Sequence, residues 1–160
     1  MIPVMQQQMY DPDVDGSRGD CLSACLASIL ELPLSEVPIF QPHEGCGAWY
    51  VHLQRWLADR GLRSLWFHTK DEGILDMPGS WDERDGPLYF IASGNSPRGD
   101  WHHATVWSVD SRGCRMVHDP HPDGTGIVID DETTYHVLVP WPQTARTNAA
   151  LAALEGGDAD

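Results

Sequence analysis

The sequence predicts an α+β domain in which two N-terminal helices pack on an antiparallel β-sheet. Residues 1–60 contain two segments whose apolar residues recur at helical spacing. Residues 61–140 instead contain short segments rich in β-branched and aromatic residues, separated by turn residues. Helices that precede a run of strands are typical of α+β proteins rather than of proteins that alternate strands and helices.

The first predicted helix follows residues 11–19, a loop rich in Asp, Gly and Pro. Asp20 is a favourable N-cap directly before it, and Pro33 ends it. Its apolar residues recur at i, i+3, i+4, i+7 and i+8 and form one stripe: Leu22, Cys25, Leu26, Ile29 and Leu30. A short helical turn is predicted at residues 35–37.

A second amphipathic helix is predicted over residues 47–60, with Gly61 as its stop. One face of this helix carries Trp49, Leu53, Trp56 and Leu57. The predicted strands follow at residues 62–68, 87–92, 102–109, 113–118 and 135–139. Residues 3–9 are a further candidate strand, and residues 94–99 and 119–126 are predicted loops.

A length of 160 residues suits one domain, which we expect over residues 1–141. Residues 142–160 are rich in Ala, Gly and Asp and are predicted to be an acidic, flexible tail. The N-terminus lacks the basic and apolar regions of a secretory signal, and no run of about 18 apolar residues occurs, so a cytoplasmic protein without a membrane span is expected.

The formal net charge is −14, from 24 acidic and 10 basic side chains. A field of that sign repels phosphate groups, which makes nucleic acid and anionic membranes unexpected partners. The four cysteines are expected to be free thiols, because the chain is not cysteine-dense and shows no secretory signal.

Cys21 is the first candidate for chemistry, because it is the first helical residue after Asp20. The positive end of a helix dipole lowers the pKa of a thiol there and favours the nucleophilic thiolate. The alternative interpretation is an incidental thiol. Cys25, one turn later, belongs to the apolar stripe and is expected in the core.

His103 and Asp119 are the next candidates. On a strand, His103 shares a face with Thr105 and Trp107, and it can face the start of a packed helix. Asp119 follows the next strand, where it could orient the imidazole as the acid of a triad does. A structural histidine and a turn-forming Asp-Pro pair are the alternatives.

These motifs resemble the papain-like cysteine peptidases. The segment Gly19-Asp20-Cys21-Leu-Ser-Ala-Cys25 looks like their nucleophile helix and is most similar to that of the double-glycine, bacteriocin-processing type. His103-Ala-Thr-Val-Trp and Asp119-Pro120 match its later motifs. Small papain-like proteins of bacteria and phages share the segments Leu32–Pro38, Ser96–Gly99 and Val117–Pro122 with this chain.

The resemblance extends over about residues 3–127. It implies a papain-like fold and a peptidase or amidase with Cys21 as nucleophile, His103 as base and Asp119 as orienting acid. It also implies a glutamine in the oxyanion hole. The candidates are Gln6, Gln7 and Gln8. We assign Gln6 to that role, with Gln8 as the second choice.

Other residues have weaker claims. Arg98, in a Gly/Pro loop, is predicted to bind a substrate carboxylate or to be a solvated loop residue. Trp49 is a candidate substrate platform, although a core position is the alternative. No cofactor is expected. The competing functions are an inactive papain-like binding module and a metal-binding hydrolase, the latter with a site at His118, His121 and Asp123.

Overall fold

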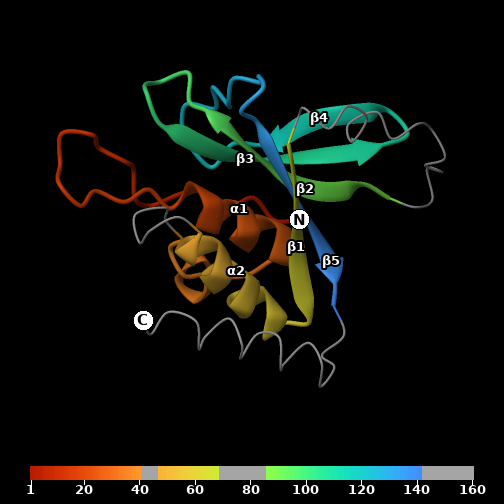
Figure 1. The fold of residues 1–160 in the computed structure, drawn as a ribbon. Coiled ribbons are helices and arrows are strands. Elements are labelled where there is room, and N and C mark those ends of the chain that lie inside the picture. The colour runs from red at the N-terminus through yellow and green to blue at the C-terminus, as the bar shows by residue number, and fades with distance from the viewer. Residues whose placement is uncertain (41–46, 69–85, 142–160) are drawn as a thin grey trace. The chain divides into compact units, whose positions relative to one another are not determined.

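The computed structural model of the chain describes residues 1–40, 47–68 and 86–141. Within these residues it contains two α-helices, one 3-10 helix and five strands (Figure 1). The bounds are α1 Cys21–Leu30, η1 Leu34–Glu36, α2 Ala48–Ala58, β1 Leu62–His68, β2 Leu88–Asn95, β3 His102–Asp110, β4 Gly113–His118 and β5 Thr134–Pro140. The predicted α+β class is confirmed.

The strands form a sheet in the order β1-β5-β2-β3-β4. β2 pairs antiparallel with both β5 and β3, and β3 pairs antiparallel with β4. In the β2–β3 pair, Gly94 lies opposite His103. In the β3–β4 pair, Val106 lies opposite His118. Because β4 returns toward the start of β3, the residues after His118 come back to His103.

The contacts divide the described residues into two compact units. One contains residues 1–40, 65–68 and 86–137, and the other contains residues 47–64 and 138–141. Cys21, His103, Asp119, Gln6 and Arg98 all belong to the first unit. A single domain over residues 1–141 stays a prediction, and the predicted tail, 142–160, lies outside the described residues.

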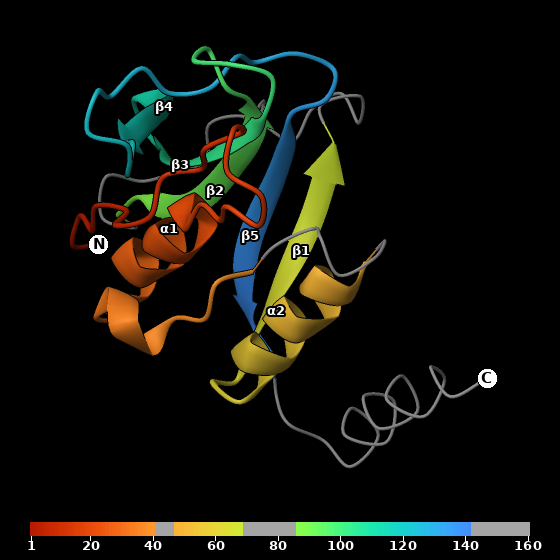
Figure 2. The same cartoon turned by 90° about the vertical axis from the view of Figure 1, so that its left-hand side faces the viewer.

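In the first unit, α1 packs against β3 and β2 (Figure 2). Cys25, Ile91 and Val106 are fully buried, so the predicted core position of Cys25 is confirmed. A second cluster contains Phe90, Ala92, Val109 and Tyr135, with no residue of α1 among its members. The start of α1 lies against β3, because the backbone N–H of Ala104 on β3 faces the sulfur of Cys21.

In the second unit, α2 buries Leu53 and Leu57, two members of its predicted face. The helix ends at Ala58, and the N–H of Gly61 donates to the Ala58 carbonyl at 2.9 Å. Gly61 has a φ of 69°, which a glycine adopts without strain. No helix among the described residues has the length and apolarity needed to cross a membrane.

The strand predicted at residues 3–9 is wrong. The backbone N–H of Ile2 donates to the carbonyl of Ser28 on α1, and that of Gln6 donates to the carbonyl of Pro120 in a loop. These partners do not form a ladder, so no strand results. β2 also extends to Asn95, into the predicted loop, because Asn95 pairs with His102 on β3.

Candidate active site

Cys21 is the first residue of α1, as predicted. The N–H groups of the first helical turn have no intrahelical acceptor and are free to face an anion. The Cys21 sulfur is faced by the backbone N–H groups of Ala104, Leu22 and Cys21 itself, all of which lower the pKa of the thiol. A thiolate or a developing oxyanion here would therefore meet several backbone donors.

The expected fall in the pKa of Cys21 is nevertheless wrong. Burial is the largest influence and raises the pKa of the thiol above its usual value, and the nearby charge of Asp20 raises it further. Removing water from a thiolate costs more than the N–H groups return. Burial also raises the pKa of Cys25 and Cys114. These three cysteines are free, and Cys46 lies outside the described residues.

Asp20 precedes α1 as predicted, but its side chain does not cap the helix. The carboxylate turns the other way and accepts hydrogen bonds from the backbone N–H groups of Gln7 and Gln8, at 3.1 to 3.2 Å. The carboxylate is buried, and each of its oxygens accepts an N–H. Asp20 therefore ties the N-terminal segment to the start of α1.

His103 and Asp119 form a buried pair, as the hairpin register predicts. His103 Nε2 lies 2.7 Å from Asp119 Oδ1, and the side chains are only 4% and 2% exposed. A carboxylate accepts and does not donate, so the neutral imidazole carries its proton on Nε2. Its lone pair is then on Nδ1, the ring atom that could accept a proton from a thiol.

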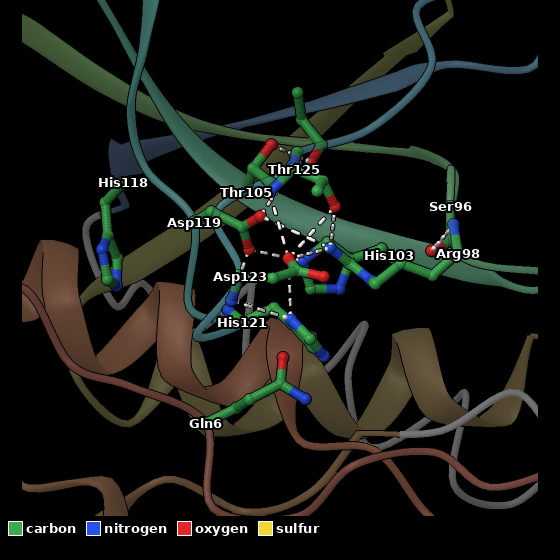
Figure 3. Close-up of polar contacts among 12 residues, drawn as sticks. Gln6, Ser96, Arg98, His103, Thr105, His118, Asp119, His121, Asp123 and Thr125 are labelled. Carbon is green, nitrogen blue, oxygen red and sulfur yellow. Dashed lines mark hydrogen bonds and ion pairs between the residues drawn. The ribbon is translucent and has the colours of Figure 1, made fainter.

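Asp119 holds more than the imidazole. Its Oδ1 also accepts the backbone N–H of His121 at 2.8 Å, and its Oδ2 accepts that of Gly126 at 2.7 Å (Figure 3). Burial opposes ionisation, but these three donors outweigh it and hold the pKa of Asp119 below its usual value. The loop 119–126 thus winds around an ionised carboxylate.

Burial lowers the pKa of His103, despite the opposing hydrogen bond and charge of Asp119. The charges of Arg98 and His121 lower it further. With the pKa of Cys21 raised and that of His103 lowered, the resting pair at neutral pH is a thiol and a neutral imidazole. This pair differs from the preformed thiolate–imidazolium that the helix position predicts.

Cys21 lies at the backbone of the residue that follows His103, because the N–H of Ala104 faces its sulfur. Within the part of the chain that the structure describes, no hydrogen bond joins the sulfur to the imidazole. Catalytic hydrogen bonds are often long before substrate binds.

No family model, curated protein or solved structure matches the chain.

Gln6 is the buried member of the three candidate glutamines, whereas Gln7 and Gln8 are exposed. Its backbone N–H donates to the Pro120 carbonyl at 3.0 Å, so it borders the 119–126 loop. Its side-chain Nε2 donates to the Gln8 carbonyl and to Met9 Sδ, and its Oε1 is buried without a partner. The amide has to turn before it can donate to an oxyanion.

Arg98 is not a solvated loop residue. Its side chain is 14% exposed, and Nη1 lies 2.8 Å from Asp123 Oδ1 and 3.7 Å from Asp119 Oδ2. The same nitrogen also donates to Thr125 Oγ1. Arg98 therefore clamps the 119–126 loop, and binding of a substrate carboxylate by Arg98 stays a prediction.

Two further sequence candidates have other partners. Trp49 belongs to α2 in the second unit, where its ring meets that of Tyr50 edge-on at 5.7 Å. His118 Nε2 lies 2.8 Å from the Val4 carbonyl, so it is engaged with the N-terminal segment. No group of three potential metal ligands gathers among the described residues.

His121 and Asp123, the other two proposed metal ligands, form a pair of their own. His121 Nδ1 lies 2.8 Å from Asp123 Oδ1, and the His121 ring stands edge-on to that of His103 at 6.1 Å. The sequence offered both residues as metal ligands because of their place in His118-Asp-Pro-His-Pro-Asp; in the structure they contact each other. Their proximity to His103 depends on the path of the loop around Asp119.

Proposed function

We propose that this chain is a thiol-dependent hydrolase with a papain-like fold that cleaves an amide or peptide bond. Cys21 is the nucleophile, His103 the general base and Asp119 the acid that orients His103. The observation that carries the proposal is the buried His103–Asp119 contact of 2.7 Å beside a cysteine at a helix N-terminus. That combination of groups is typical of nucleophilic acyl transfer.

The neutral resting pair favours general-base catalysis. The Cys21 proton passes to His103 Nδ1 as the sulfur attacks the carbonyl carbon, and the carbonyl electron pair moves to oxygen. Asp119 stabilises the imidazolium that forms. The imidazolium then protonates the leaving amine, and water attacks the thioester to release the acid and restore the thiol.

The proposal is tested by incubating the chain with a panel of electrophilic amide and ester probes and mapping the modified residue by mass spectrometry. We expect modification at Cys21, slowed in the His103→Ala variant and unaffected in the His102→Ala variant. His102 is exposed on the neighbouring strand position and serves as the matched control. Probes that modify Cys114 or Cys46 in preference to Cys21 would refute the assignment.

A further inference from the structure

Two loops flank the start of β3, close to His103. The loop 96–101 joins β2 to β3 and carries Arg98, and the loop 119–126 follows β4, the other neighbour of β3 in the sheet. Within the first loop, the backbone N–H of Arg98 donates to Ser96 Oγ at 3.2 Å, and Ser96 is buried. Arg98 therefore extends from an anchored loop directly before the strand that carries the proposed base.

The Arg98 side chain bridges the two loops through a single nitrogen. Nη1 lies 2.8 Å from Asp123 Oδ1 and 3.7 Å from Asp119 Oδ2, and it also donates to Thr125 Oγ1. Figure 3 shows this side chain reaching from one loop to the other. The side chains of Arg98 and Asp119 are 14% and 2% exposed, so solvent ions screen the attraction between their charges only weakly.

The guanidinium separates two carboxylates, those of Asp119 and Asp123. Two neighbouring carboxylates without a cation between them disfavour the ionisation of each other. A guanidinium keeps its charge at every pH at which the chain is folded, so this effect does not depend on a titration. The ionised form of Asp119 is the one that accepts the Nε2–H of His103, at 2.7 Å. The charge of Arg98 therefore favours the state of Asp119 that the base requires.

Arg98 acts here as a point charge rather than as a two-pronged fork. Its other terminal nitrogen, Nη2, is buried and has no hydrogen-bond partner among the described residues. A fork that grips a carboxylate uses two guanidinium nitrogens, and in this conformation solvent does not reach the second one. A single ammonium group in the place of Nη1 would supply the same charge.

We propose that Arg98 is a positioning residue that acts on His103 through Asp119. The inference rests on the proposed function, because it needs His103 to take the proton of Cys21. Pairing with Arg98 holds the Asp119 carboxylate ionised against Nε2 of the imidazole. Nδ1 then stays the ring atom that accepts the thiol proton. In this role Arg98 touches neither the sulfur nor the substrate.

A double-mutant cycle on the acylation of Cys21 tests this role. p-Nitrophenyl acetate is uncharged, and it acylates the thiol with release of p-nitrophenolate, so a lost contact with a substrate carboxylate cannot change its rate. Rates are measured for the full chain, for Arg98→Gln and for Arg98→Lys, each with and without Asp119→Asn, well below the melting temperature of every variant. Arg115→Gln is the matched control, because Arg115 pairs with Asp110 at the opposite end of the β3–β4 hairpin.

We expect Arg98→Gln to slow acylation about 10- to 10²-fold, the scale of a small misplacement of a reacting group. In the Asp119→Asn background the same change should cost less than about twofold, because the residue through which Arg98 acts is already altered. Arg98→Lys should recover most of the rate, and Arg115→Gln should keep the full rate. Arg98→Met, which also lacks the charge, replaces Arg98→Gln in the cycle if that variant does not fold.

Equal losses with and without Asp119→Asn would make Arg98 structural and overturn the proposal, as would a full rate in Arg98→Gln. Failure of both uncharged variants to fold would overturn it in the same way. A loss with iodoacetate, but none with iodoacetamide or p-nitrophenyl acetate, would instead assign Arg98 to binding a substrate carboxylate. Failure of the proposed function looks different: p-nitrophenyl acetate would then acylate the unmodified chain no faster than Cys21→Ser.

Discussion

Replacing Asp119 by asparagine tests the site as a unit. The carboxylate accepts three N–H groups, with Oδ1 shared by His103 and His121 and Oδ2 used by Gly126. Asparagine keeps the shape but offers one accepting oxygen and one NH2 group. Each orientation of the amide therefore places a donor against a donor.

The two orientations fail in different ways. With its oxygen toward His103, the amide NH2 faces the Gly126 N–H, and a buried donor without an acceptor costs about 1–3 kcal/mol of stability. With its oxygen toward Gly126, the NH2 donates to His103 Nε2. The imidazole proton then moves to Nδ1, which can no longer accept the Cys21 proton.

The loss in rate should be large because the resting pair is neutral. The orienting acid must stabilise an imidazolium that forms only during attack, as in a serine triad, where the amide variant loses about 10⁴-fold. Allowing for the better thiol nucleophile, we expect about a 10³-fold loss, which is about 4 kcal/mol of barrier. The melting temperature should fall by several degrees.

The assay is acylation by p-nitrophenyl acetate together with thermal unfolding of Asp119→Asn. Asp110→Asn is the matched control, because Asp110 also binds arginines but lies at the opposite end of the β3–β4 hairpin. Asp110→Asn should keep the full rate. An unchanged rate in Asp119→Asn would reduce Asp119 to a loop-forming residue and leave only Cys21 and His103 in the proposed mechanism.

Three further predictions follow from the same contacts. His103→Ala should slow Cys21 alkylation strongly and His102→Ala should not, as measured by iodoacetamide labelling; the reverse would place the base on the other strand face. His136 is buried with a pKa lowered to about 4, so the unfolded state binds its proton first as pH falls from 6.5. Stability should therefore decrease by about 3 kcal/mol between pH 6.5 and 4, and denaturant titrations of His136→Gln should show a flatter profile. Asp20→Asn should speed Cys21 alkylation at fixed pH, because the charge of Asp20 raises the pKa of the thiol. The melting temperature of this variant should fall, because the amide accepts weaker hydrogen bonds from the backbone N–H groups of Gln7 and Gln8. Slower alkylation would contradict the prediction.

Much of the fold follows from local sequence signals. β1 and β4 have the predicted bounds, and in each case a glycine with positive φ marks the start: Gly61 at 69° and Gly113 at 102°. Glycine adopts a positive φ at little energetic cost, so the residue type itself predicts the turn. The conformation of residues 3–9 could not be predicted from local signals in this way. Their hydrogen-bond partners, Ser28 and Pro120, are distant in the sequence, and no local pattern reveals them.

The candidate site was predictable where it depended on register. A hairpin of two short strands places the residue after β4 beside the start of β3, and Asp119 indeed contacts His103. The direction of the Cys21 pKa was not predictable in this way. A helix N-terminus lowers the pKa of any thiol, but the burial that overrides it is set by the packing of α1 on β3.

The loop 119–126 explains why one carboxylate can influence so many groups. Asp119 accepts two of the loop's own backbone N–H groups, and Arg98 joins the loop through Asp123 and Thr125. Folding of the loop and orientation of the base therefore share the same two oxygens. A variant of Asp119 therefore alters both at once. For this reason the acylation rate and the melting temperature of Asp119→Asn are measured together: the rate reports the orientation of the base, and the melting temperature reports the stability of the folded loop.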